Sequence, residues 1–360
     1  MRIFFGVALI FSLIISAVVV SNAQSAGQGR APASTTRTVK TRATPKAPSR
    51  TAADELVAIL PASNLIAVVD VGRAFNELLP KVAGLTVGGV DKLAKSIQDF
   101  TQKTGIDPSR IQTAVIGVSM DGPQGTGVVI IQGIDPDPQQ IEALMKELGS
   151  EFNTSEYKGK TIYNVLSKAK SPSAGSFSLK TDELALTALG RQRVALGDMK
   201  VVKQVIDIQS GAAKGGVSAA MTGALNETRA SALVRFALNI PETLRAEAAN
   251  QGDLFKSVAS VKMILGTFDV AADLGLSLDA LIRTASQNDA TELENGLKGL
   301  IALGKDIFGS GDPKTNLISQ LLDQVKIGSK VSDVAVSISL PRALLEQLTK
   351  KETSPPAEKK

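Results

Sequence analysis

No cysteine occurs anywhere in this 360-residue chain, and that absence limits how the chain can hold a fold together. Without disulfides, a buried apolar core must stabilise the folded state alone. About 300 residues remain between the two terminal segments described below, which is enough for one large domain or two smaller ones. The sequence therefore has to specify at least one sizeable core.

The N-terminus has the pattern of a bacterial export signal. Arg2 precedes an apolar run from Ile3 to Val20, and small residues occupy positions 21 and 23. A signal peptidase reads small residues at this spacing, so we predict cleavage after Ala23 and a periplasmic or extracellular protein that begins at Gln24. The alternative is an uncleaved membrane anchor, because a helix over residues 3–20 would rise ~27 Å, close to the bilayer's hydrocarbon thickness.

Charge is distributed unevenly along the chain, whose formal net charge is +5. The segment 24–50 contains no acidic residue and six basic ones, which are Arg30, Arg37, Lys40, Arg42, Lys46 and Arg50. Arg2 and the tail 350–360 are also basic, which leaves residues 51–349 with a charge of about −4. A mildly acidic region is not typical of nucleic-acid-binding domains, so we expect no nucleic-acid partner.

Residues 24–50 are predicted to form a disordered linker, and residues 350–360 a disordered tail. The linker is rich in Ser, Thr, Ala, Pro and Arg, and Val39 is its one large apolar residue, so it cannot bury enough surface to offset the entropy lost on ordering. Its basic residues could contact an anionic lipid surface or a cell-wall polymer and so keep the protein near a membrane. The alternative is a solvated spacer.

Three segments have the patterns of strands. Leu65 to Val71 and Val128 to Ile131 are continuous apolar runs rich in β-branched residues, which is typical of central strands covered on both faces. Val334 to Leu340 alternates apolar with small residues, which predicts a strand with one face in water.

Helix signals lie between the strands. Asp137 is placed to cap a helix over residues 138–148, with Pro138 at its first position, Gln140 completing a capping box and Gly149 ending it. A second helix is predicted over residues 91–104. Asp198 is expected to cap a third, over residues 199–209.

The order of these elements indicates an α+β fold with two related halves, residues 51–215 and 216–349. The first half is predicted to hold strands 65–71, 111–120 and 126–133, helices within 73–104 and at 138–148, and further strands from about 157 to 196. Its opening matches the βαββαβ order of ferredoxin-like folds. The second half repeats that order with strands at 232–238, 261–270 and 334–340 and a helix at 289–308. We therefore predict mainly antiparallel sheets with helices on one face, and a duplicated ferredoxin-like unit as the source of the two halves.

Three segments resemble uncharacterised exported bacterial proteins that are grouped only as a domain of unknown function. These segments are LPAS at 60–63, KTGIDPSRI at 103–111 and VSISLPRALLEQL at 336–348. The resemblance extends over about residues 54–348. It implies no activity, cofactor or site residue.

The chain also lacks histidine and tryptophan. This excludes nucleophilic systems that pair Ser or Cys with His, and zinc or copper sites built on imidazole or thiolate, and we expect no cofactor. A Ser/Lys hydrolase remains conceivable because residues 167–170 fit S-x-x-K and residues 103–105 fit K-T-G. Those enzymes carry S-x-x-K first, on a helix, and K-T-G later, on a strand. This chain reverses the order, so we assign no catalytic residue.

Other polar clusters are better explained by roles in turns and helices than by ligand binding. The glycine-rich stretch 122–127 joins two predicted strands and reads as a hairpin loop rather than a phosphate-binding loop. Three carboxylate pairs could bind calcium or act as acid and base, but they lack the spacing of a calcium loop, and we assign no metal site; they are Asp135 and Asp137, Asp269 and Asp273, and Glu292 and Glu294.

Asp70 is the residue we select as a ligand-site candidate. It ends a buried strand just before a helix, where ligands are often bound, although the same position suits a helix cap.

These observations favour a non-enzymatic binding or interaction module of the bacterial envelope, whose partner is an envelope protein, a polymer or an anionic surface. Two alternatives stay open, a carboxylate-based hydrolase acting on an envelope polymer and a structural component of an envelope assembly. Aromatic residues make up only 4% of the chain, which disfavours a sugar-cleaving site because such sites stack rings on aromatic faces.

Overall fold

The computed structural model describes residues 51–83, 90–120, 125–147, 151–166, 183–250, 259–308 and 313–350. The predicted signal or anchor, the cleavage site after Ala23, the basic linker, the S-x-x-K segment and the tail beyond Lys350 lie outside the described residues. Within the described ranges, no helix combines the length and the apolar character needed to cross a membrane.

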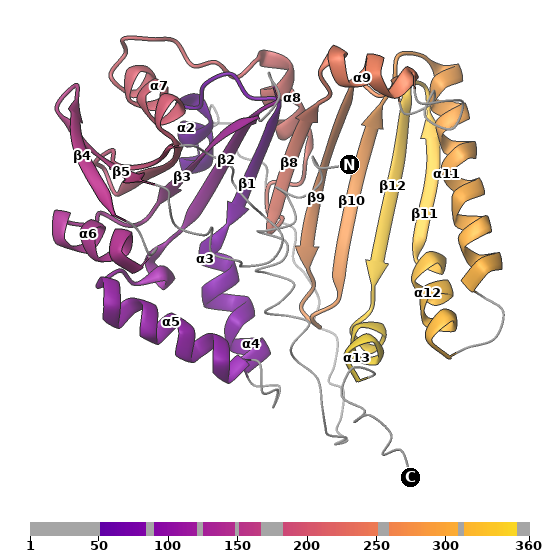
Figure 1. Ribbon diagram of the computed structural model, residues 1–360. Coiled ribbons are helices and arrows are strands. Elements are labelled where there is room, and N and C mark those ends of the chain that lie inside the picture. The colour runs from indigo at the N-terminus through magenta and orange to yellow at the C-terminus, as the bar shows by residue number, and fades with distance from the viewer. Residues whose placement is uncertain are drawn as a thin grey trace, which may run out of the picture.

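Twelve strands of the described chain form one sheet, and every neighbouring pair in it is antiparallel (Figure 1). From edge to edge the order is β11-β12-β10-β9-β8-β1-β2-β3-β7-β6-β5-β4. The first half supplies β1 (Leu65–Asp70), β2 (Thr113–Ser119), β3 (Thr126–Gln132), β4 (Phe152–Tyr157), β5 (Lys160–Leu166), β6 (Glu183–Ala188) and β7 (Arg193–Asp198). The second half supplies β8 (Val234–Asn239), β9 (Met263–Val270), β10 (Leu276–Arg283), β11 (Val325–Lys330) and β12 (Asp333–Leu340).

Helices connect these strands and flank the sheet. Those of the described residues are α2 (Ala52–Ala58), α3 (Val71–Arg73), α4 (Leu79–Ala83), α5 (Val90–Thr104), α6 (Pro138–Glu147), α7 (Met199–Gln209), α8 (Ala219–Glu227), α9 (Glu242–Ala249), α11 (Gln287–Phe308), α12 (Pro313–Asp323) and α13 (Arg342–Lys350). A π-helical segment, Ala74–Leu78, joins α3 to α4, and a 3₁₀ turn, Pro108–Arg110, precedes β2.

The capping prediction is confirmed for α6 and wrong for α7. Asp137 Oδ1 accepts a hydrogen bond from the Gln140 N–H at 2.8 Å, and Gln140 Oε1 accepts one from the Asp137 N–H at 3.1 Å. The Asp198 side chain makes no cap hydrogen bond and instead accepts from the Gly127 N–H at 2.8 Å. Asp198 is the last residue of β7, which pairs with β3, so its carboxylate reaches the neighbouring strand rather than the helix that follows.

The two halves share a single sheet, which is continuous because β1 pairs with β8. Leu65 lies opposite Leu238 and Val69 opposite Val234 in this antiparallel pair. In Figure 1 the indigo and magenta half meets the orange and yellow half at these two strands. The order β8-β9-β10-β12-β11 repeats the order β1-β2-β3-β7-β6, and a helix precedes the first strand of each half.

The α+β class and the antiparallel sheet are confirmed, whereas the ferredoxin-like units are not. In a split βαβ unit, the two strands joined by the first helix run parallel with another strand between them. Here β1 pairs directly with β2, and the pair is antiparallel. Each half therefore follows the predicted element order but not the ferredoxin-like strand arrangement.

Helices cover both faces of the sheet, so the expectation of helices on one face is wrong. Val68 of β1 packs in a cluster with Leu56 of α2 and Leu225 of α8. The next residue, Val69, points to the other face and packs in a cluster with Leu345 of α13. The reason lies in β1 itself, because a strand that is apolar on both sides needs cover on both sides.

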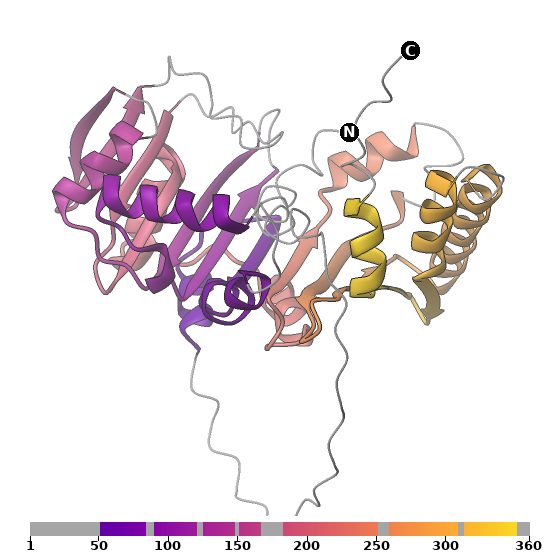
Figure 2. The ribbon, with the colours of Figure 1, turned by 90° about the horizontal axis from the view of Figure 1, so that it is seen from below.

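At the sheet's two ends, separate clusters form. Met145 of α6 packs with strands β5 to β7, and Leu293 of α11 packs near Val334 of β12. Figure 2 shows the yellow helix α13 and the orange helices α11 and α12 on the same side of the second half. On β12, Ala335 and Ser339 are exposed, which confirms the predicted strand with one face in water.

Candidate functional site

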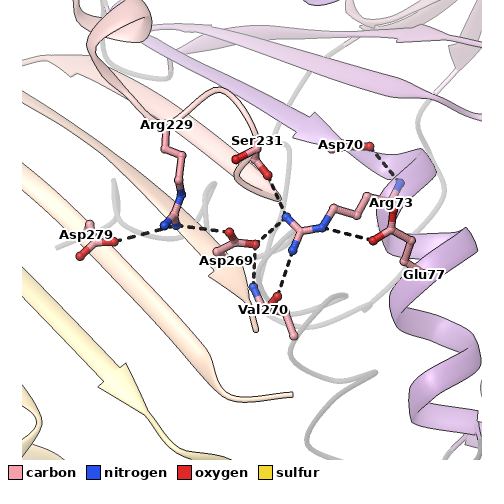
Figure 3. A network of polar contacts seen from close by, with 8 residues as sticks. All are labelled: Asp70, Arg73, Glu77, Arg229, Ser231, Asp269, Val270 and Asp279. Carbon is pink, nitrogen blue, oxygen red and sulfur yellow. Dashed lines mark hydrogen bonds and ion pairs between the residues drawn. The ribbon is translucent and has the colours of Figure 1, made fainter. Parts of the chain in front are cut away.

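Asp70, the ligand-site candidate, lies at the end of β1 as predicted. Its Oδ1 accepts a hydrogen bond from the Arg73 N–H at 2.9 Å and so caps the short helix α3 (Figure 3). The capping alternative therefore accounts for this carboxylate, and the structure directs attention to Arg73.

Arg73 extends from the first half of the chain into the second (Figure 3). Its Nη1 lies 2.7 Å from Asp269 Oδ1 and 2.9 Å from the Ser231 carbonyl, and its Nη2 lies 3.0 Å from the Val270 carbonyl. Its Nε lies 3.8 Å from the Glu77 carboxylate, one helical turn on. A single guanidinium, with five donors in a rigid plane, thus ties the last residue of α3 to the end of β9.

Asp269 receives two arginines. Its second oxygen lies 3.2 Å from Arg229, which also lies 4.0 Å from Asp279, and its first oxygen accepts the Val270 N–H at 2.9 Å. The Asp269 side chain is only 16% exposed. We infer that this cluster is a structural clamp between the halves, because both oxygens of its central carboxylate are already engaged.

Two carboxylates from the pairs that the sequence analysis weighed, Asp273 and Glu294, are likewise engaged in local structure. Asp273 Oδ1 accepts from the Gly275 N–H at 3.0 Å in the turn between β9 and β10, where the sequence placed it. Glu294 accepts from Lys298 at 2.6 Å and from the Ser329 hydroxyl, and the Lys298 hydrogen bond lowers the pKa of Glu294. In the described residues, no three acidic side chains are grouped so that they could hold a metal ion.

The K-T-G segment ends a helix, as the sequence indicated. Lys103 lies in the last turn of α5 and its Nζ is 2.6 Å from Glu147 Oε1 of α6. Thr104 donates to the Phe100 carbonyl within the same helix. These partners give Lys103 a role in packing two helices together.

A cleft of about 480 Å³ lies where α2, α7 and two hairpin turns meet. Four cationic side chains and one acidic side chain line it, namely Lys158, Lys160, Arg191, Arg193 and Glu55. The apolar part of its lining comes from Ala58, Ile59, Leu189 and Ile206. This concentration of positive charge contrasts with the mildly acidic character of residues 51–349.

Two tight turns bring the cations to the cleft. Lys158 and Gly159 form the two-residue turn between β4 and β5, with φ angles of 49° and 70°. Gly190, Arg191 and Gln192 lie in the turn between β6 and β7, with φ angles of 80°, 54° and 59°. The left-handed conformation favours glycine, and each turn contains one.

Two of the four cations already have carboxylate partners. Arg193, whose side chain is 10% exposed, pairs with Glu55 and donates to Gln132 Oε1 at 2.7 Å. Lys158 Nζ lies 2.5 Å from Asp207 Oδ1 on α7. The walls of the cleft are therefore held in place by ion pairs that join α2 and α7 to the strands.

Lys160 and Arg191 have no carboxylate partner among the described residues. Lys160 Nζ donates to the Leu189 carbonyl at 3.0 Å, which fixes its position at the neighbouring turn. Arg191 is exposed, and its side chain makes no hydrogen bond or ion pair with the described part of the chain. These two side chains supply the cleft's surplus positive charge.

Tyr157 contacts Lys158 of the turn and two residues of α7, Lys203 and Asp207. Its hydroxyl lies 3.0 Å from Asp207 Oδ1, and its ring centroid lies 5.7 Å from Lys158 Nζ and 5.5 Å from Lys203 Nζ. The hydrogen bond from Lys158 lowers the pKa of Asp207, and the hydrogen bond to Asp207 raises the pKa of Lys158. Both shifts favour the ionised pair.

No family model matches the sequence, and no curated protein matches it either. Among solved structures, crystal form I of TP0453 aligns with a TM-score of 0.42 and 8% identity over 83% of this chain and 97% of that chain. Crystal form III of TP0453 gives a TM-score of 0.42 and 10% identity over 82% of this chain and 96% of that chain. Scores at this level are too low to establish a shared fold or function.

The cleft is the feature that the sequence analysis missed. One local signal was available, since basic residues flank a glycine turn in Lys158-Gly159-Lys160 and follow one in Gly190-Arg191-Gln192-Arg193. Neither motif alone indicates a site, because a basic turn is usually solvated. Their convergence depends on β5 pairing with β6, which no local pattern predicts.

Proposed function

We propose that this protein is an exported, non-enzymatic binding module of the bacterial envelope, and that the basic cleft is its binding site. The observation that carries the proposal is the surplus charge of Lys160 and Arg191 within a cleft whose other charged groups are paired. Preformed concave sites with a few fixed polar groups are where proteins bind ligands. The export signal supports the envelope location.

In this proposal the linker has a separate role as a tether. Its six basic residues contact anionic lipid or cell-wall polymer at up to ~1 kcal/mol each near an anionic membrane, and salt weakens that contact. The cleft then recognises one specific component. A structural role in an envelope assembly and a carboxylate-based hydrolase are the alternatives.

We further propose that the two halves arose by duplication. Support comes from the repeated strand order on either side of the pair formed by β1 and β8, and from α2 and α8, which precede the first strand of each half and pack in the same cluster. The second half departs from the first by lacking counterparts of β4 and β5 in the described residues.

The test compares three forms of the mature protein as baits for envelope extracts. They are the wild type, a form with the six linker cations changed to Gln, and a form carrying Lys160→Gln and Arg191→Gln. We expect the linker variant to lose binding that is sensitive to salt, and the cleft variant to lose a specific component at physiological salt.

A screen of glycan and peptide hydrolysis on the same samples separates the alternatives. Retention of every component by the cleft variant would remove the cleft from the function. Turnover by the wild type that disappears when a single carboxylate is changed would show an enzyme instead.

A further inference from the structure

We propose that the basic cleft binds a ligand in which a phosphate group is joined to an apolar portion. The inference rests on the proposed function and specifies its ligand. It follows from three features of the cleft, which are its uncompensated charge, the placement of Lys160 beside the turn that carries Arg191, and the apolar part of its lining.

The uncompensated charge favours an anion. Glu55 offsets Arg193, and Asp207 offsets Lys158, which leaves the charges of Lys160 and Arg191. Two cations held in one concave site repel each other unless an anion lies between them. A group that carries close to two negative charges, such as a phosphate monoester, compensates both.

The free donors of Lys160 and Arg191 come from adjacent parts of the cleft. A β-carbon built at Gly190 would lie 3.6 Å from Lys160 Nζ, so the Lys160 ammonium lies against the turn that carries Arg191. One of three Lys160 donors is used by the Leu189 carbonyl, and the Arg191 guanidinium offers five more in a fixed plane. Arginine suits phosphate because its donors bind two oxygens at once.

The apolar lining indicates that the ligand is more than an inorganic ion. Ala58 and Ile59 present accessible apolar surface to the cleft, and the buried side chains of Leu189 and Ile206 lie behind it. The cleft is large enough for a small molecule. Inorganic phosphate would leave the accessible apolar surface in water, whereas an attached apolar portion would cover it. Both a soluble phosphate ester and the headgroup region of a phospholipid offer this combination.

The test measures phenyl phosphate, inorganic phosphate and benzyl alcohol by isothermal titration against the mature protein. We expect phenyl phosphate to bind more tightly than either of the other two probes. Arg191→Gln and Lys160→Gln should each weaken phenyl phosphate tenfold or more, because each removes a hydrogen bond to a charged group. The matched control is Lys326→Gln, which removes one exposed positive charge at the far end of the sheet and should leave the affinity unchanged.

The source of the phosphate is distinguished by competition. The competition uses the protein whose linker cations are changed to Gln, with phenyl phosphate bound in the cleft. Displacement of phenyl phosphate by phosphatidic acid vesicles would identify a lipid as the ligand. Phenyl phosphate that stays bound in the presence of the vesicles would identify a soluble ester. Thermal melting of each variant verifies the fold. Because the Arg191 side chain is exposed and makes no hydrogen bond or ion pair with the described residues, Arg191→Gln remains informative even if Lys160→Gln is unstable.

Equal affinity of phenyl phosphate and inorganic phosphate would overturn the proposed ligand, as would equal losses in Arg191→Gln and Lys326→Gln. Envelope extracts keep this failure separate from that of the proposed function. If phenyl phosphate does not bind but the cleft variant still loses a specific envelope component, the ligand class is wrong and the binding module stands. If neither is observed, both proposals are wrong.

Discussion

The clamp between Arg73 and Asp269 provides the sharpest test of how the two halves are held together. Changing Arg73 to Met keeps most of the aliphatic stem and removes the charge and all five donors. The change leaves the Ser231 and Val270 carbonyls without their guanidinium partner. It also leaves Arg229 as the remaining arginine partner of Asp269.

The magnitude follows from the contacts. At 2.7 Å and an effective dielectric constant of ~20, the gross attraction between Arg73 and Asp269 is ~6 kcal/mol. Desolvation offsets most of it, because the two side chains are only 21% and 16% exposed. A charged hydrogen bond typically retains ~1.5–3 kcal/mol, and the part-buried Val270 carbonyl left unpaired adds ~1 kcal/mol or more, whereas water can replace Arg73 at the exposed Ser231 carbonyl. We expect Arg73→Met to lower the free energy of unfolding by ~2.5–4 kcal/mol.

A double-mutant cycle with Asp269→Ala, followed by urea unfolding and circular dichroism, isolates the pair. We expect a coupling energy of ~1.5–3 kcal/mol between the two positions. The exposed pair of Lys103 and Glu147 serves as the control, since ion pairs between exposed side chains give ~0.2–1 kcal/mol. A coupling between Arg73 and Asp269 no larger than that of the control would refute the clamp.

Three further predictions concern the joint between the halves, a strained turn and pH. Gly216→Ala should destabilise the protein by more than ~2 kcal/mol in a urea titration, because the added β-carbon would lie 2.1 Å from a backbone nitrogen just after α2. The control is Gly223→Ala within α8, where the added β-carbon meets open space and should stabilise the protein by up to ~1 kcal/mol. Val331→Gly should raise the melting temperature by relieving ~1–2 kcal/mol of strain at φ 55° on a side chain that is 68% exposed, and an equal gain in Val331→Ala would contradict this cause. The pKa of Asp207 is lowered in the folded state, so the pair with Lys158 stabilises the fold above the ordinary pKa of about 3.8 and loses that effect as the pH falls below it; Asp207→Asn should therefore flatten the acid side of a plot of melting temperature against pH.

Features that depend on residues close together in the chain could be predicted. The capping box of Asp137 and Gln140 involves residues three apart, and the structure contains both hydrogen bonds. The two-sided burial of β1 follows from an apolar run with no polar alternation. Local signals of this kind predicted β1, the helices α5, α6 and α7, and the capping role that was the alternative for Asp70.

Features that depend on distant pairing could not be predicted. Asp198 has a residue type and position that suit a cap, yet its carboxylate accepts a hydrogen bond from the Gly127 N–H of β3. This contact exists because β7 lies between β6, its neighbour in sequence, and β3, which is distant in sequence. The single sheet exists because β1 pairs with β8, and no hydrophobic period specifies which strand edge meets which. The clamp of Arg73 and Asp269 spans 196 positions of sequence and depends on that pairing.

The linker and the cleft carry positive charge in two different arrangements, and each arrangement predicts a different mode of binding. A net charge of about −4 over residues 51–349 predicts weak binding of the folded region to extended anionic surfaces, and the structure gives no reason to revise that expectation. The cations Lys160 and Arg191 of the cleft are a different case, because a single anionic group can contact both of them. Salt should separate the two modes of binding. The linker's contacts are screened over a Debye length of ~8 Å at physiological ionic strength, whereas an anion held between Lys160 and Arg191 is in direct contact with both and is screened much less. Under the proposed function, binding that survives physiological salt should be lost with Lys160→Gln and Arg191→Gln, and binding that disappears with salt should be lost when the linker cations are changed.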